Sequence, residues 1–205
     1  MFADIEVTQL YILRHGECEG GNIFRGSTDV ALLEKGMANM NSACKQSNVV
    51  WDVIVSSPLI RCHEFAKAKS QELSRPLVVD ERLREMFFGS WEGKLMEDVW
   101  REQYDSITAW MKNPEAADPP NGEPLAEVFE RVEVCYQQLL AAHRGKKILL
   151  VTHGGIVRAL LTFLLGMPRS KIQAFDVPYA SLSQVSVYHM EHGDRVKLTA
   201  HNFTQ

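Results

Sequence analysis

Two histidines, each followed by glycine, lie just beyond the ends of two short apolar segments. His15 comes after the segment 9–13, with Arg14 beside it, and His153 comes after the segment 147–151. Arg61 and Glu85 lie in polar segments that follow other apolar runs. Each residue alone has a structural explanation, but the repeated pattern does not. Because glycine lets a backbone approach a ligand closely, we interpret these segments as parts of one binding site.

The charge of these side chains indicates an anionic ligand. Two guanidinium groups would repel a metal cation, and the sequence has neither an HExxH motif nor paired cysteine ligands. It also lacks a GxxxxGK[ST] loop and a GxSxG nucleophile elbow. Planar guanidinium groups are well suited to phosphate. We therefore expect a phosphate site that holds no metal and no other cofactor.

A glutamate near a phosphate site predicts a hydrolytic reaction. A neutral imidazole nitrogen can attack phosphorus and form a phosphohistidine, which divides hydrolysis into two steps. The leaving alkoxide needs a proton, which Glu85 can supply if the phosphate dianion raises its pKa. Arginine and histidine donors would stabilise the charge on the transferring group, so no Mg²⁺ is required.

Alternating strands and helices must position these groups. Apolar runs and period-two alternation predict six strands, at 9–13, 51–55, 77–79, 147–151, 182–188 and 195–199. Helical spacing predicts helices at 32–47, 59–73, 95–111, 125–143 and 155–165, with Ser57 as the cap of the second. This order predicts an α/β fold, a three-layer α/β/α sandwich with a mainly parallel central sheet. Ligands of such sheets bind beyond the carboxyl ends of the strands.

Length and composition set the class of protein. The chain has 205 residues, a formal net charge of −4 and 45% hydrophobic residues, which favours a single soluble domain. The mild acidity argues against nucleic acid as a partner. No apolar run is long enough to cross a membrane, and the first residues lack the features of a signal peptide, so we expect a cytoplasmic protein. Four cysteines without a CxxC motif are expected to be free thiols. The oligomeric state stays open.

The same segments resemble the motifs of the histidine phosphatase superfamily, also called phosphoglycerate-mutase-like. The matching motifs run in the family's order from 13 to 158: Arg14–Glu17, Gly26–Gly36, Ser56–Arg61, Leu83–Met86 and Val151–Gly155. The resemblance implies one domain over 1–205, with a cap-like insertion around 94–124. It also implies a nucleophilic role for His15, phosphoryl binding by Arg14, Arg61 and His153, and proton transfer by Glu85.

Some positions depart from the family's pattern. Cys18 stands where threonine or serine is common, and Gly21 stands where the family usually has asparagine, with Asn22 one residue later. We include Asn22 and Gly154 as candidates for substrate binding. A further hypothesis is that the cationic site lowers the pKa of the Cys18 or Cys62 thiol and makes activity sensitive to oxidation.

The branch of the family is indicated by length and by one motif. The chain is short after the glutamate motif, which favours a phosphatase over a phosphoglycerate mutase. The run 85–93 resembles that of α-ribazole-5′-phosphate phosphatases of cobalamin biosynthesis. Fructose-2,6-bisphosphatases and broad-specificity sugar phosphatases are the alternatives. A phosphate-ester-binding pseudophosphatase is disfavoured because the expected reactive residues are present. Trp100, Tyr104 and Trp110 are candidates either for stacking on a flat base or for the core.

Overall fold

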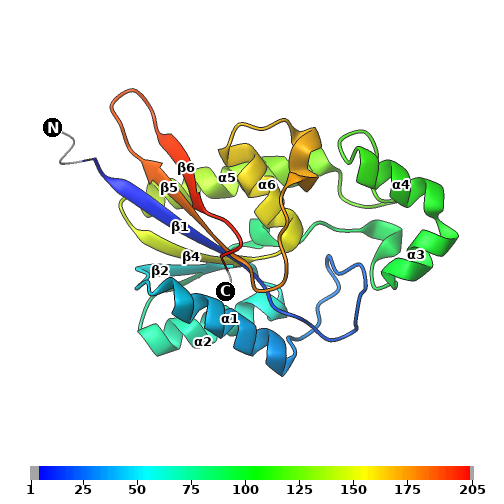
Figure 1. Cartoon of the computed structure of the whole chain (residues 1–205), viewed down its shortest axis with the longest axis horizontal. Coiled ribbons are helices and arrows are strands. Elements are labelled where there is room, and N and C mark those ends of the chain that lie inside the picture. The colour runs from blue at the N-terminus through cyan, green and yellow to red at the C-terminus, as the bar shows by residue number, and fades with distance from the viewer. Residues whose placement is uncertain (1–4, 204–205) are drawn as a thin grey trace.

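The six predicted strands form one sheet in the computed structural model, which describes residues 5–203 (Figure 1). The sheet order is β3-β2-β4-β1-β5-β6. The pairs β1–β4, β2–β4 and β2–β3 are parallel, whereas β5 is antiparallel to both of its neighbours. The mainly parallel α/β fold is thus confirmed. The strands span Val7–Arg14 (β1), Val53–Ser56 (β2), Leu77–Val79 (β3), Lys147–Thr152 (β4), Leu182–Tyr188 (β5) and Arg195–Ala200 (β6).

Alternation along the strands creates two hydrophobic layers. In β1, Leu10 and Ile12 pack with α5 (Leu125–Ala142) and α6 (Gly154–Leu164), whereas Tyr11 and Leu13 pack with α1 (Glu34–Ser47) and α2 (Ile60–Leu73). Figure 1 shows these two helix pairs on opposite faces of the sheet. Burial of both faces explains why the central strands are continuous apolar runs. Within residues 5–203, no helix has the length and apolar character that crossing a bilayer requires.

The helix predicted over 95–111 is two helices, α3 (Met96–Glu102) and α4 (Tyr104–Lys112), which lie beyond one end of the sheet (Figure 1). The chain leaves helical geometry at Gln103. The side-chain oxygen of Gln103 accepts a hydrogen bond from the Trp91 indole at 2.8 Å, and Trp91 is fully buried. The break thus supplies an acceptor that a buried indole requires. Short 3₁₀ helices span Glu81–Leu83 (η1), Gly89–Trp91 (η2) and Arg169–Ala174 (η3).

Helix α2 begins differently from the prediction. Ser57 does not cap it, because the helix starts at Ile60 with Leu59 at its N-terminal boundary. The Ser57 hydroxyl bonds to His153 instead, at 2.7 Å, and Asp29 accepts the hydrogen bond from the Ile60 amide at 2.8 Å. The loop after β1 therefore completes the start of α2.

The turn after β1 packs backbone to backbone against the start of α1. A Cβ on Gly16 would lie 2.3 Å from the Gly36 carbonyl oxygen, and a Cβ on Gly36 would lie 2.2 Å from that of Glu17. Close approach to protein backbone, rather than to a ligand, explains the glycine that follows His15.

We predict that Gly36→Ala destabilises the protein, although alanine is the better helix former. The helical gain is at most about 1 kcal/mol, whereas forcing apart two backbone segments costs about 1–3 kcal/mol or more. Denaturant unfolding should show the loss. Asn41→Ala, at an exposed position of the same helix, is the matched control and should not lower stability. A Gly36→Ala protein as stable as wild type would contradict the prediction.

Candidate active site

Strand register brings the two histidines together. Arg14 in β1 pairs with Thr152 in β4, so the next residues, His15 and His153, leave the sheet side by side. The His15 amide donates to the Thr152 carbonyl at 2.9 Å. The two imidazole centroids are 5.2 Å apart. The expectation that these strand ends meet at one place is confirmed.

His15 is held as a neutral imidazole with one free nitrogen. Its Nδ1 lies 2.8 Å from the Gly16 carbonyl oxygen, which can only accept, so Nδ1 carries the proton. Burial, together with the positive charges of Arg61 and Arg14, holds the pKa of His15 well below its usual range. The lone pair is therefore on Nε2, which makes this nitrogen the candidate nucleophile.

Arg61 and His153 form a buried layer next to His15. The Arg61 Nε donates to His153 Nδ1 at 3.2 Å, so the His153 proton is on Nε2, where it bonds to Ser57. Burial and the Arg61 charge hold the pKa of His153 well below its usual range. The other Arg61 donors reach the backbone carbonyls of Arg25, Gly26 and Thr28, at 2.8–3.1 Å. Direct phosphoryl binding by Arg61 and His153 stays a prediction, because these donors are occupied by protein acceptors.

Glu92 holds the loop that supplies those carbonyls. Its carboxylate accepts bonds from the backbone amides of Ser27, Thr28 and Phe88, at 2.9–3.0 Å, and from the Thr28 hydroxyl at 2.6 Å. The sequence singled out Glu92 only as part of the run 85–93. In the structure it links this run to the loop around Arg61.

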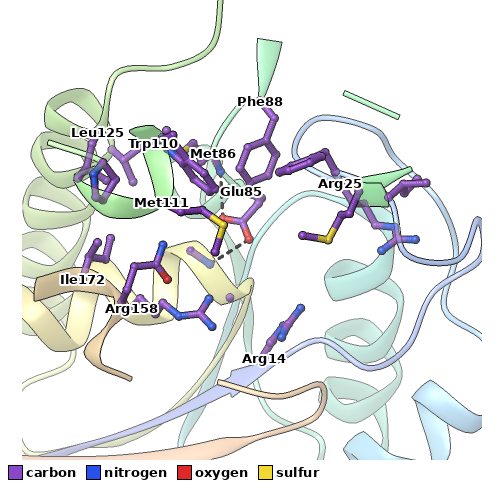
Figure 2. A pocket seen from close by; sticks show the side chains of 18 of the residues that line it. Arg14, Arg25, Glu85, Met86, Phe88, Trp110, Met111, Leu125, Arg158 and Ile172 are labelled. Carbon is purple, nitrogen blue, oxygen red and sulfur yellow. Dashed lines mark hydrogen bonds between the residues drawn. The ribbon is translucent and has the colours of Figure 1, made fainter. Parts of the chain in front are cut away.

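A cavity of about 290 Å³ lies beside His15. Its polar side chains come from several segments that lie far apart in the sequence, and Figure 2 shows Glu85 near the centre of the cavity with Arg14 and Arg158 to one side. The predicted residues Arg14, His15, Asn22, Glu85 and Gly154 all line this cavity, whereas Arg61 and His153 do not. Across residues 5–203, no three His, Cys, Asp or Glu side chains gather in a way that could hold a metal ion.

Glu85 is oriented by two backbone amides. Its carboxylate oxygens accept hydrogen bonds from Met86 and Gly155, each at 3.0 Å, as Figure 2 shows. A Cβ on Gly155 would lie 2.4 Å from Glu85 Oε1. This glycine therefore makes room for the carboxylate, not for a ligand as the sequence suggested. The carboxyl group is held at the N-terminus of α6, facing the cavity.

Arg14 offers a free donor to that cavity. Its guanidinium lies over the Tyr179 ring, 4.1 Å from the ring centroid, and one terminal nitrogen donates to the Val177 carbonyl. Its Nε is buried and has no hydrogen-bond partner in the part of the chain that the structure describes. Burial lowers the pKa of Arg14, as expected for a cation that has lost solvent. An anion in the cavity would supply the missing partner.

Among the polar residues that line the cavity, sequence reasoning missed Arg25, Arg158, Gln173 and Tyr179. Arg25 donates to the Glu19 and Gly21 carbonyls, which folds the first loop around it. An arginine on a predicted helix normally indicates a solvated surface. The available signal for Arg158 was its spacing, because it follows Gly154 by four positions and so lies on the same face of α6.

The cysteine hypothesis is wrong in its premise. All four thiols are free and buried, as expected, but burial raises the pKa of Cys18 and of Cys62 despite the nearby arginines. The Cys18 thiol lies 3.4 Å from His15 Nδ1 and donates to the Gly16 carbonyl. It is therefore a protonated neighbour of the candidate nucleophile, not a reactive thiolate.

The three cap aromatics occupy different environments. Trp110 lines the cavity and packs edge-to-face on Phe88, with centroids 5.9 Å apart. Trp100 and Tyr104 contact each other outside the cavity lining, and Tyr104 is 61% exposed. Of the three, only Trp110 can stack on a ligand in this cavity.

Comparison with known proteins identifies relatives of the chain. Residues 10–201 match the family model of the histidine phosphatase superfamily (branch 1). Phosphoserine phosphatase 1 of Hydrogenobacter thermophilus is 31% identical over 192 residues, covering 90% of this chain and 88% of the relative. The adenosylcobalamin/alpha-ribazole phosphatase of Escherichia coli is 28% identical, with 87% and 90% covered.

Solved structures give a similar result. A mycobacterial glucosyl-3-phosphoglycerate phosphatase superposes with a TM-score of 0.86 at 27% identity, covering 97% of this chain and 100% of that one. The alpha-ribazole phosphatase of Shigella flexneri superposes with a TM-score of 0.80 at 26% identity, covering 95% and 96%. The same scaffold thus occurs in phosphatases with different named substrates.

The two neutral histidines predict a loss of stability in acid. Unfolding frees each imidazole to bind a proton near pH 6.5, whereas the folded protein resists this until a much lower pH. The free energy of unfolding should therefore fall as pH drops below about 6.5, by up to about 1.4 kcal/mol per pH unit for each histidine.

Denaturant titrations between pH 7 and pH 5 measure this slope. His15→Gln should reduce the slope of the free energy of unfolding against pH by an amount equivalent to up to one bound proton. His192→Gln controls for the loss of an exposed imidazole. An unchanged slope in His15→Gln would show that His15 is not held neutral by the fold.

Proposed function

The chain belongs to the histidine phosphatase superfamily, and from this premise we propose that it hydrolyses phosphate monoesters through a phosphohistidine at His15, without a metal ion. The main support for the proposal is that the proton of the neutral His15 ring lies on Nδ1. The Gly16 carbonyl holds the proton on Nδ1 and leaves the Nε2 lone pair free, in a cavity that also contains Arg14 and Glu85.

The first step transfers the phosphoryl group to the protein. The Nε2 lone pair of His15 attacks phosphorus, and the bond from phosphorus to the ester oxygen breaks. The protonated carboxyl group of Glu85 gives its proton to the departing oxygen, and the alcohol leaves. The free Nε of Arg14 stabilises charge on the phosphoryl oxygens, with Arg61 and His153 as further candidates.

The second step returns the protein to its starting state. Glu85, now a carboxylate, takes a proton from water while the water oxygen attacks phosphorus. The phosphorus–nitrogen bond breaks, its electron pair returns to Nε2, and inorganic phosphate leaves. The proton stays on Nδ1, hydrogen-bonded to the Gly16 carbonyl oxygen, through both steps, so this carbonyl offsets the positive charge that the phosphorylated imidazole gains.

His15→Ala should abolish hydrolysis of p-nitrophenyl phosphate measured in the presence of a chelator. A rapidly quenched wild-type reaction should carry one acid-labile phosphoryl group on His15, detected by mass spectrometry under alkaline conditions. His192→Ala, at an exposed histidine, is the matched control and should retain full activity. Wild type without turnover of any phosphomonoester in chelator would refute the proposal.

We propose α-ribazole 5′-phosphate as the first candidate substrate, which would place the protein in cobalamin biosynthesis. Three observations support this substrate: the resemblance of the run 85–93, the 28% identity to the adenosylcobalamin/alpha-ribazole phosphatase of Escherichia coli, and the apolar wall of the cavity. Away from Glu85 this wall is largely apolar, and Trp110 offers a face to a flat base. Residues of this wall include Met86, Phe88, Met111, Leu125, Val128 and Ile172.

Phosphoserine is the second candidate, because a specific observation favours it. The phosphoserine phosphatase relative is 31% identical, and the Arg158 terminal nitrogens make no ion pair with any residue in 5–203. Fructose 2,6-bisphosphate and 3-phosphoglycerate complete the panel of alternatives.

We further propose a cytoplasmic protein with small-molecule partners, since four unpaired thiols suit a reducing compartment.

Trp110→Leu should change selectivity if a flat base stacks on this indole. The ratio of kcat/KM for α-ribazole 5′-phosphate to that for glycerol 3-phosphate should fall about 2- to 10-fold. Trp100→Leu is the matched control outside the cavity lining and should keep the ratio. Trp110→Phe, which retains an aromatic face, should restore most of it. A ratio that Trp110→Leu leaves unchanged would remove the stacking argument for α-ribazole.

A further inference from the structure

Arg158 lies at the edge of the cavity, and its terminal nitrogens have no hydrogen-bond or ion-pair partner among the described residues. It projects from the first turns of α6 into the cavity, and its Nε donates to the Phe175 carbonyl at 3.0 Å. Burial lowers the pKa of Arg158, and the negative charges of Glu85 and Asp176 offset this effect only in part. Such an arrangement is typical of a binding group rather than of a structural one.

The position of Arg158 is set by Gly154. The point that a Cβ on Gly154 would occupy lies 3.3 Å from Arg158 Nη1 and 3.2 Å from Arg14 Nε. A side chain at this position would therefore enter the space between the two guanidiniums. The absence of a Cβ lets both cations converge above the N-terminus of α6, which itself favours anions.

Arg158 lies on the side of the cavity that Glu85 faces, which is the leaving-group side in the proposed reaction. The charges that lower the pKa of His15 come from Arg61, Arg14 and Arg25. Arg158 is not among these charges; it interacts with Glu85 and Asp176, whose negative charges raise its pKa against the effect of burial, and its own charge lowers the pKa of Arg14. Glu85 is the group that meets the departing oxygen. Figure 2 shows Arg158 below Glu85, on the same side of the cavity as Ile172 and Met111.

We propose that Arg158, together with Gln173 of η3, forms a subsite for an oxygen-bearing substituent of the leaving alcohol. This inference rests on the proposed phosphatase function. Gln173 also lines the cavity, and its side chain has an amide that can donate or accept. The shared chemistry is an oxygen acceptor close to the ester oxygen. Either a carboxylate, as in phosphoserine, or the hydroxyls of a ribose phosphate would supply it.

Arg158→Met tests the subsite by substrate selectivity. For each substrate, kcat/KM is divided by that for phenyl phosphate, which has no oxygen substituent on its leaving group. This ratio should fall about 10- to 100-fold for phosphoserine or for ribose 5-phosphate, mainly through KM. Arg195→Met, at an exposed arginine of β6, is the matched control and should leave the ratio unchanged. Gln173→Leu should lower the ratio in the same direction by a smaller factor.

Matched substrates identify the source of the oxygen. A loss for phosphoserine without a loss for phosphoethanolamine assigns the subsite to a carboxylate. A loss for ribose 5-phosphate without a loss for its 2,3-dideoxy analogue assigns it to hydroxyls. An equal loss on phenyl phosphate would overturn the proposal, since Arg158 would then serve the phosphoryl group or the fold. No change in any ratio would overturn it as well.

A binding measurement separates this inference from the proposed function. Calorimetric affinities of phosphoserine and ribose 5-phosphate are measured for His15→Ala with and without Arg158→Met. Weaker binding of one of them in the double variant supports the subsite even if wild type shows no turnover. Equal affinities of both ligands in the two proteins would overturn the subsite while leaving hydrolysis by the wild-type protein untouched.

Discussion

The fully buried guanidinium of Arg61 is the interaction on which the rest of the site depends. A charge removed from water requires a partner for nearly every donor, and its closest carboxylate oxygen, on Asp29, is 4.0 Å away. Backbone carbonyls of the loop after β1 and the His153 ring provide these partners. One side chain thus fixes the loop and the His153 tautomer, and its charge helps to keep both imidazoles neutral. Glu92 stabilises the same loop from its other side.

The part of the site that could be predicted follows from sheet geometry. Carboxyl ends of neighbouring parallel strands must meet, so polar residues just after apolar runs were sufficient to bring His15 and His153 together. Local contacts were not predictable in the same way. The partner of Ser57 is His153, which is 96 residues away, and the neighbours of Gly16 and Gly155 are other parts of the chain. Arg158 was missed because a helical arginine is usually solvated, and its spacing of four from Gly154 was the one indication in the sequence that it faces the site.

The cavity combines two kinds of surface that come from different parts of the fold. Its polar end is built on β1, on the start of α6 and on the glutamate segment, where backbone hydrogen bonds fix each group. Its apolar wall comes from α3, α4 and α5 and also from the segments 23–24 and 86–88, and the break between α3 and α4 is held by the Trp91–Gln103 bond. Similar phosphatases are named for different substrates, and a constant polar end with a variable apolar wall would account for this variety. The wall can change without disturbing the groups to which we assign the chemistry.

The carbonyl of Gly16 has a consequence for the covalent chemistry of His15. An imidazole can accept a phosphoryl group on either nitrogen, and the two products are distinct isomers. Because the proton on Nδ1 is held by a backbone oxygen whose position depends on the contact with Gly36, only the tele isomer, phosphorylated on Nε2, is compatible with the fold. A glycine–glycine contact between a turn and a helix would thereby determine the regiochemistry of the proposed intermediate.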